Sequence, residues 1–169
     1  MDLYTVDRLG ALASGMECGL VEHQDINPQA IADLIKEFCP GGISRHGDRY
    51  LASMPSGDSV TDANTEMLFE LVRQAKYPDR PSRYQSIFAV DTIDAARLFA
   101  GTYGNYPCNI YQLNSPGAFR ADMGLLDARY SEVRKVWHAN RYWQGLPHPD
   151  AQPFWEYLVP CPVVIGALV

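Results

Sequence analysis

The chain has 169 residues, of which 47% are hydrophobic and 20% are charged, and its net charge is −6 at pH 7. This length predicts one domain over residues 1–169, large enough to bury a core without disulfides or a metal. The acidic balance argues against binding along a nucleic-acid backbone, which requires clustered Lys and Arg. It leaves open which macromolecule or small molecule is the partner.

The cysteines and the N-terminal residues predict a metal-free cytoplasmic protein. No two cysteines form a Cys-x-x-Cys pair and none has a His at ligand spacing, which argues against a zinc site. The first residues lack the basic start and apolar run of a signal peptide, and no apolar stretch approaches the roughly 20 residues that span a bilayer. We therefore expect thiols in a reducing compartment and no membrane contact. The cysteines are Cys18, Cys39, Cys108 and Cys161.

The N-terminal third is predicted to contain two strands and a helix. Alternating polarity predicts a strand over residues 2–8, and a second short strand follows at residues 16–22. Asn27 can cap the first helix and Pro28 suits its first position. Its apolar side chains recur at helical spacing, which predicts that they face the core. They are Ile31, Leu34, Ile35 and Phe38.

The middle of the chain is predicted to alternate loops, helices and a strand. A polar stretch rich in turn residues predicts a long loop around a short strand at residues 50–53. The apolar spacing predicts a helix over residues 62–75. Residues 83–90 predict a strand that leads directly into a helix capped by Asp91 or Thr92.

The C-terminal third is predicted to contain two strands and a helix. A strand is expected over residues 108–113, followed by a turn at 114–117 and a helix over 126–140. The apolar, β-branched run 158–169 is interrupted by two prolines, which predicts an edge strand or a bulged strand start. No repeat and no linker divides the chain.

Three stretches of the chain, taken in order, form a set. They are Leu3-Tyr4-Thr5-Val6-Asp7-Arg8, then Ser86-Ile87-Phe88-Ala89-Val90-Asp91 before an alanine-rich helix, then Phe154-Trp155-Glu156-Tyr157-Leu158-Val159-Pro160. The set resembles the three strand motifs of the ADP-ribosyltransferase superfamily, especially its small rifampin-modifying branch. The chain also resembles an uncharacterised bacterial and phage family with a similar Ser-Arg-His-Gly and Pro-Ser-Arg-Tyr-Gln-Ser signature, which we associate with the same fold.

The resemblance implies both a fold and an activity. The implied fold is α+β, with an ADP-ribosyltransferase-like split β-sheet core and flanking helices. The implied activity is mono-ADP-ribosyl transfer, with NAD as the substrate that donates the group and a protein, nucleic acid or small molecule as acceptor, as in a toxin, an effector or a phage protein. The alternative is a catalytically inactive binding or inhibitor protein on the same fold, because fold alone does not dictate function.

The implied chemistry requires a carboxylate and an aromatic ring. Transfer from NAD passes through a cationic, oxocarbenium-like ribose, which a carboxylate bound to the ribose 2′-hydroxyl stabilises. Glu156, at the start of the third motif, is the first candidate. Asp122 is the second, because it follows a Pro-Gly-x-Phe turn like that of the rifampin-modifying branch. Phe88 is the expected nicotinamide-stacking ring, with Ile87 or Tyr84 as the alternative occupant of that place.

The implied NAD-binding residues are spread over the first two motifs and the loop between them. Thr5 stands where the family has His or Arg, and one hydroxyl cannot replace a cation or a ring. Arg45 and His46 could compensate, and Arg45 and Arg83 are candidates for the pyrophosphate, since a guanidinium binds phosphate bidentately. The complete implied set is Tyr4, Thr5, Ser44, Arg45, Arg83, Tyr84 and Ser86.

Two further groups of residues are expected to border the cleft. Ser82, Gln85 and Ser86 are polar within a strand-like segment, which favours a wet cleft over a packed core. Tyr142 and Trp143 follow the predicted end of a helix. These two aromatic residues could cover the cleft or bind a target, or Trp143 could pack on the sheet.

Overall fold

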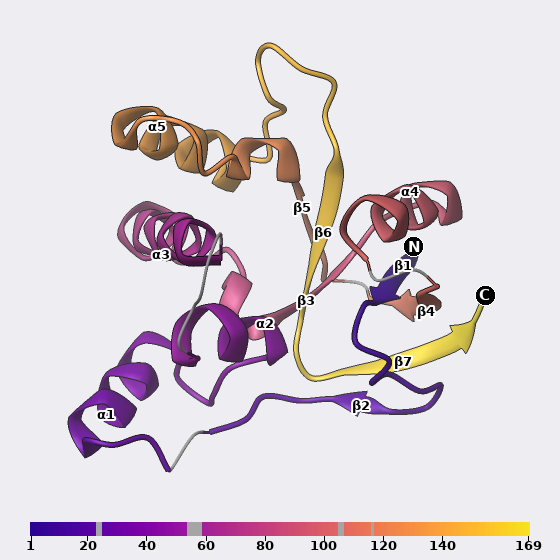
Figure 1. Cartoon of the computed structure of the whole chain (residues 1–169), viewed down its shortest axis with the longest axis horizontal. Helices are drawn as coiled ribbons and strands as arrows, with labels where there is room; N and C mark the ends of the chain where they lie inside the picture. The colour runs from indigo at the N-terminus through magenta and orange to yellow at the C-terminus, as the bar shows by residue number, and fades with distance from the viewer. Residues whose placement is uncertain (23–24, 54–58, 105–106, 116) are drawn as a thin grey trace.

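A computed structural model describes residues 1–22, 25–53, 59–104, 107–115 and 117–169, and it has the predicted α+β class (Figure 1). A four-stranded antiparallel sheet has the order β1-β4-β7-β2, and a three-stranded antiparallel sheet has the order β3-β6-β5. The strands are β1 (Asp2–Asp7), β2 (Glu17–Cys18), β3 (Ser86–Ala89), β4 (Asn109–Asn114), β5 (Phe119–Asp122), β6 (Trp155–Pro160) and β7 (Val163–Leu168). The helices are α1 (Gln29–Phe38), α2 (Arg45–Gly47), α3 (Ser59–Lys76), α4 (Ile93–Tyr103) and α5 (Glu132–Trp143).

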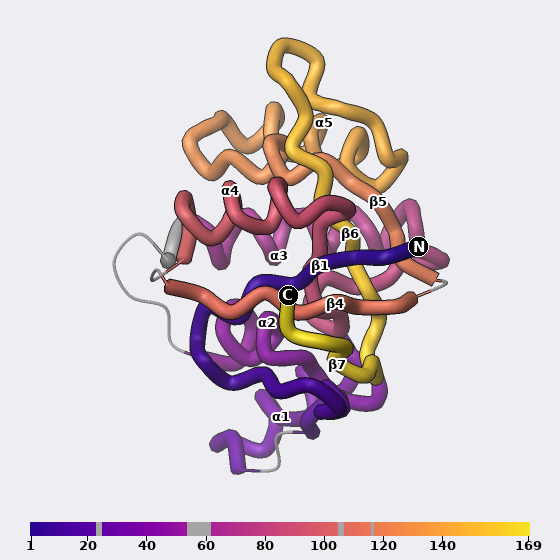
Figure 2. The backbone as a smooth tube through the Cα atoms, turned by 90° about the vertical axis from the view of Figure 1, so that its right-hand side faces the viewer, coloured from indigo at the N-terminus to yellow at the C-terminus, as the bar shows by residue number. Residues whose placement is uncertain are grey.

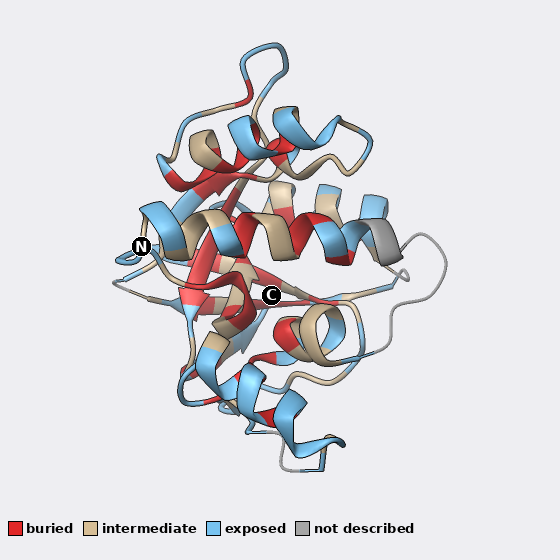
Figure 3. Cartoon of the chain, turned by 90° about the vertical axis from the view of Figure 1, so that its left-hand side faces the viewer, coloured by how far each residue is buried: buried red, intermediate tan, exposed pale blue. Residues whose placement is uncertain are grey.

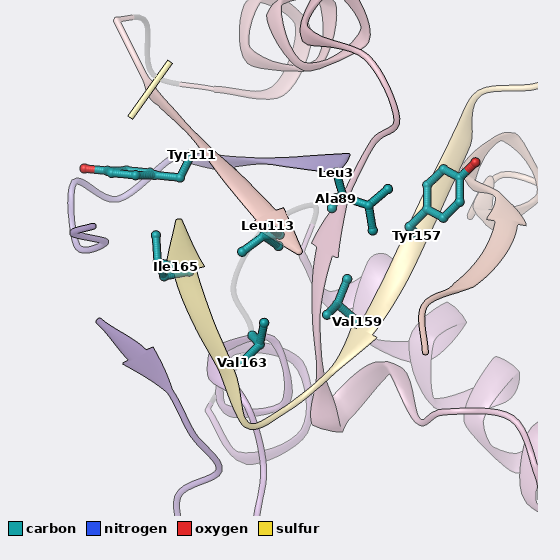
Figure 4. Close-up of a cluster of buried hydrophobic side chains, with 8 residues drawn as sticks. All are labelled: Leu3, Ala89, Tyr111, Leu113, Tyr157, Val159, Val163 and Ile165. Carbon is teal, nitrogen blue, oxygen red and sulfur yellow. The ribbon is translucent and has the colours of Figure 1, made fainter. Parts of the chain in front are cut away.

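The apolar run at the C-terminal end forms two strands, one in each sheet. The sequence predicted one interrupted strand over residues 158–169, whereas β6 and β7 are separated by Cys161 and Pro162. Proline has no backbone N–H, so the ladder stops there and the chain turns into the second sheet. Side chains from the facing sides of both sheets form one buried cluster, to which β7 contributes Val163 and Ile165 (Figure 4).

The two sheets meet where β1 runs beside β3. Tyr4 and Val90 exchange both backbone hydrogen bonds, each at 2.8 Å. The Thr5 hydroxyl donates to the carbonyl oxygen of Phe88 at 2.8 Å. The strands predicted at residues 2–8 and 83–90 are therefore joined across the fold, and both termini lie at the four-stranded sheet (Figure 2).

The helices α3 and α5 pack together on one face of the three-stranded sheet. Fully buried side chains of Phe69, Tyr142 and Trp143 meet Leu158 of β6 there. The outer faces of the helices are exposed and their inner faces are buried (Figure 3). No helix in the described part of the chain has the length and apolarity required to cross a membrane.

Several predicted elements differ from the observed ones for local reasons. Pro28, rather than Asn27, precedes the first helical residue of α1, and only one predicted stripe residue, Ile35, is buried, while Ile31 is 45% exposed. The short strand predicted at 50–53 is wrong, because Asp48–Ala52 form one turn of π-helix, η1.

Two further differences between the predicted and the observed elements lie next to Asp122. The sequence predicted a helix from residue 126, but the Asp122 carboxylate caps a 3₁₀ turn, Met123–Leu126, and α5 begins only at Glu132. The strand β5, which ends at Asp122, has no counterpart among the predicted strands, since four residues carry too little alternation to predict a strand.

Helix α5 carries a fully buried histidine. His138 has its ring centroid 4.8 Å from that of Tyr130 and 5.1 Å from that of His148. Burial lowers the pKa of His138 below its ordinary value of 6.5, and the nearby His148, Arg134 and Arg141 act in the same direction. The folded chain therefore holds this imidazole neutral at pH values where the unfolded chain protonates it.

We expect the free energy of unfolding to fall as the pH drops below about 6.5, because the unfolded state then binds a proton that the folded state does not. Urea unfolding at pH 5.5 and 7.5 measures this difference, and His138→Gln should reduce it. The assignment to His138 would be contradicted if the wild type were more stable at pH 5.5 than at pH 7.5. It would also be contradicted if His138→Gln and the wild type lost the same free energy of unfolding between these two pH values.

Candidate functional site

The candidate site is built around one buried arginine. Arg83 opens a 3₁₀ turn, η2 (Arg83–Gln85), whose N-terminal cap is Ser82; the Ser82 hydroxyl accepts the N–H of Tyr84. This turn directs Arg83 into the interior, where the residue is 4% exposed. A buried guanidinium requires carboxylate partners, because the cost of removing its charge from water is otherwise several kcal/mol.

Two glutamates from different elements supply those partners. Glu66 of α3 accepts from Arg83 Nε at 2.6 Å and from Nη2 at 2.9 Å, which is a bidentate pair. Glu156 of β6 accepts through Oε1 from Arg83 Nη1 at 2.5 Å. The Tyr142 hydroxyl of α5 donates to the same oxygen of Glu156 at 2.7 Å and also contacts Arg83 Nη1.

Aromatic rings form a wall beside these charges. The guanidinium carbon of Arg83 lies 4.5 Å from the ring centroid of Phe88. His46, from α2, lies with its ring centroid 4.5 Å from that of Phe88 and 4.6 Å from that of Tyr50. Phe88 pairs with Leu158 in the sheet, two residues after Glu156, so Phe88 and Glu156 belong to one face of the sheet. We call this set the Arg83 cluster: His46, Tyr50, Glu66, Arg83, Phe88, Tyr142 and Glu156.

The charges of the Arg83 cluster reinforce one another. Burial by itself would raise the pKa of Glu66, but Arg83 and His46 outweigh it and hold that pKa well below its usual range. Burial would lower the pKa of Arg83, but Glu156 and Glu66 raise it well above its usual range. The pKa of Tyr142 is also well above its usual value, chiefly because of burial, so its hydroxyl stays protonated and can donate.

Three residues singled out from the sequence therefore meet in space. Arg83 and Phe88 lie five residues apart in one stretch of the chain, and Arg83 contacts both Phe88 and Glu156 of β6. The expected role of Arg83 changes, however. Its guanidinium binds two carboxylates inside the protein, which does not fit the predicted role of pyrophosphate ligand.

Asp122, the second candidate carboxylate, lies elsewhere. Asp122 is fully buried and accepts three backbone N–H groups, those of Gly124 at 2.9 Å, His148 at 2.6 Å and Phe154 at 2.9 Å. In the ladder it pairs with Trp155, one residue before Glu156, which places the two carboxylates on opposite faces of the sheet. The geometry assigns Asp122 to anchoring the loop before β6, away from the Arg83 cluster.

The residues expected to bind NAD are dispersed over several parts of the fold. Tyr4 packs with Val90 on the α4 side of β1, whereas Thr5 is bonded to the backbone beside Phe88. Tyr84 is fully buried beneath α1, so it does not fit a ring that stacks on nicotinamide. Ser44 caps α2 by accepting the N–H of Gly47, and Arg45 follows it as an exposed side chain beside His46.

The polar residues that open β3 border a separate hollow of about 420 Å³. Ser82, Gln85 and Ser86 line it together with Arg80 and Cys161. The Ser86 hydroxyl donates to the Ser82 carbonyl at 2.7 Å, and burial raises the pKa of the Cys161 thiol to about 11. These residues do line a hollow, as the sequence suggested. Glu156, however, lies near the opposite end of the β3–β6 pair from Ser86, because Ser86 pairs with Pro160 and Ala89 pairs with Tyr157.

Sequence reasoning missed Glu66, Tyr50 and the polar role of Tyr142. Glu66 and Glu70 are buried on α3 beside Phe69, at helical spacing within the inward face. Two glutamates on the apolar, inward face of a predicted helix indicate a buried ion pair, because a buried Glu is almost always paired. No comparable signal identified Tyr142, whose hydroxyl finds its partners only through tertiary packing. Within the described part of the chain, no three His, Cys, Asp or Glu side chains are grouped to hold a metal.

Comparison with known proteins identifies a family but no activity. A family model described as "Protein of unknown function (DUF2441)" matches residues 22–167, which include every member of the Arg83 cluster. The strand β1, which carries Thr5, precedes the matched segment. No curated protein matches the chain.

Proposed function

This chain belongs to the DUF2441 family of proteins of unknown function, and we propose that it is an NAD-dependent mono-ADP-ribosyltransferase. In this proposal its two sheets are an ADP-ribosyltransferase-like split core, and Glu156 stabilises the cationic ribose. The observation that carries the proposal is the contact of Arg83 with both Glu156 and the Phe88 ring.

The arrangement of the three motif strands supports the same reading. β1 contacts β3 through Tyr4 and Val90, and β3 pairs with β6 over its whole length. The three stretches that resemble the superfamily are therefore neighbours in space, although long segments separate them in the chain. This adjacency is what a shared NAD cleft requires.

The chemistry assigns separate tasks to the two oxygens of Glu156. Oε1 is held by Arg83 and Tyr142, which fixes the orientation of the carboxylate. Oε2 is the oxygen we assign to the ribose 2′-hydroxyl, where negative charge stabilises the ribose as its bond to nicotinamide breaks. Such preorganised charge is worth about 2.7–4 kcal/mol in comparable sites. Arg45, exposed next to His46, is the candidate for the pyrophosphate.

The test is release of nicotinamide from NAD by the wild type beside Glu156→Gln and Asp122→Asn. We expect Glu156→Gln to lower turnover about 10²–10³-fold, because the amide carries no charge. Asp122→Asn should keep its turnover at a temperature where it remains folded, since its carboxylate holds only backbone N–H groups. Equal turnover by Glu156→Gln and the wild type would overturn the role of Glu156.

A binding protein on the same fold is the second candidate, and two observations favour it. Thr5 stands where the superfamily has a His or Arg, and its hydroxyl is already bonded to Phe88. Glu156 is only 4% exposed, so NAD would have to uncover it. No turnover by the wild type, together with no thermal shift from millimolar NAD, would select this alternative.

A further inference from the structure

The imidazole of His46 is placed between an aromatic wall and a buried carboxylate. Its ring packs against Phe88 and Tyr50, and its Nε2 atom lies 3.2 Å from Glu66 Oε1. The two atoms are within ion-pair distance, although Nε2 does not form an aligned hydrogen bond. The His46 side chain is 14% exposed, compared with 4% for Arg83, so His46 is the more open of the two basic members of the Arg83 cluster.

The backbone fixes where this ring can go. Gly47, which follows His46, has no room for a side chain, because a Cβ there would lie 2.5 Å from the Tyr84 carbonyl oxygen and 2.8 Å from the Ile43 Cβ. The Ser44 backbone N–H also donates to the Tyr84 carbonyl at 2.8 Å. The turn that carries His46 is therefore seated directly on the η2 segment that carries Arg83.

We infer that His46 is the general base that takes the proton from the acceptor hydroxyl, or from water, in the proposed transfer, and that Glu66 positions it. The inference rests on the proposed function. Glu66 faces Nε2, which leaves Nδ1 as the basic atom, and the carboxylate stabilises the imidazolium that forms. Glu66 is in turn held by Arg83, which also holds Glu156, so the base and the ribose-stabilising carboxylate share one support.

The step balances without any further reactant. The bond from the ribose C1′ to the nicotinamide nitrogen breaks, and its electron pair neutralises the pyridinium. The acceptor oxygen forms a new bond to C1′ while its proton passes to His46. His46 then releases the proton to solvent, so the products are nicotinamide, the ADP-ribosylated acceptor (or ADP-ribose when water reacts) and H⁺.

The charged groups around His46 come from each element packed against it. Glu66 faces it from α3, Arg83 lies behind Glu66 on η2, and Glu156 lies beyond Arg83 on β6. On its own segment Arg45 precedes it and the phenol of Tyr50 contacts it. The charged group in contact with His46 is thus the carboxylate of Glu66.

The test measures kcat and KM for nicotinamide release from NAD, with water as acceptor, from pH 5.5 to 9. We compare the wild type, His46→Gln and the control Asp94→Asn, whose side chain is 93% exposed on α4. We expect His46→Gln to lower kcat about 10²–10⁴-fold with KM nearly unchanged and to lose the acid limb of the wild-type profile. Asp94→Asn should behave as the wild type.

Chemical rescue separates a base from a purely structural ring. In His46→Ala, added imidazole should restore turnover, and substituted imidazoles should restore it in proportion to their basicity. A His46→Gln enzyme that keeps the wild-type pH profile, or a His46→Ala enzyme that imidazole does not rescue, would overturn the base assignment alone. No nicotinamide release by the wild type would instead overturn the proposed function, and the base assignment with it.

Discussion

Replacing Arg83 by methionine is expected to lower the free energy of unfolding by about 3–5 kcal/mol. The methionine removes the guanidinium that pairs with both Glu66 and Glu156, which are 7% and 4% exposed. Two carboxylates then remain in a low-dielectric interior, with only Tyr142 and His46 beside them. Urea unfolding at pH 7 measures the loss, and Arg83→Lys should recover part of it, because lysine restores the charge without the bidentate geometry.

The matched control is Arg97→Met on α4. Arg97 pairs with Asp94 at 3.4 Å, but its side chain is 70% exposed, and such surface pairs contribute about 0–1 kcal/mol. The double variant Arg83→Met with Glu156→Gln should be more stable than Arg83→Met alone, since it removes one of the stranded charges. A loss below 1 kcal/mol for Arg83→Met, or a double variant less stable than the single one, would show that the pairing does not stabilise the fold.

Replacing Trp143 by alanine is expected to cost about 3–5 kcal/mol of stability. Trp143 is fully buried, its ring centroid lies 5.9 Å from that of Phe119, and its indole N–H donates to the Phe69 carbonyl at 2.8 Å. The alanine leaves a cavity between α3, α5 and β5 and removes the hydrogen-bond partner of a buried carbonyl.

Trp137 provides the control on the same helix. It is 47% exposed, and its identified neighbours are the guanidinium of Arg141 at 5.4 Å and the His138 ring. We expect Trp137→Ala to change the unfolding free energy by less than about 1 kcal/mol. Thermal or urea unfolding of the two alanine variants side by side gives the comparison. Equal losses for the two tryptophans would contradict the assignment of the core around Trp143.

The sequence was sufficient where a local rule decides the structure. The strand predicted over residues 2–8 is confirmed as β1, because its alternation matches one buried and one less buried face. Thr92, one of two predicted caps, accepts the Ala95 N–H at the start of α4. In both places the deciding contacts are within a few residues, so periodicity and capping chemistry carry the information.

The sequence was insufficient where distant contacts decide. Ile31 and Ile35 satisfy the same helical spacing, yet of these two only Ile35 is buried in α1, because distant segments of the chain decide which face of the helix is covered. Asp122 follows a turn that resembles a catalytic one, but two of the three N–H groups that it accepts belong to residues 26 and 32 positions away, His148 and Phe154. Likewise, nothing local indicates that Glu66 and Glu156 share one arginine.

The division of the C-terminal run between two sheets has a consequence for synthesis and folding. β6 is the middle strand of one sheet and β7 is an interior strand of the other, and together they cover residues 155–168. A chain that has been made only as far as residue 154 therefore lacks the strand that joins β3 to β5 and the strand that joins β4 to β2. Neither sheet can close before residues 155–168 have been made, and strands that form earlier would have unpaired edges until then.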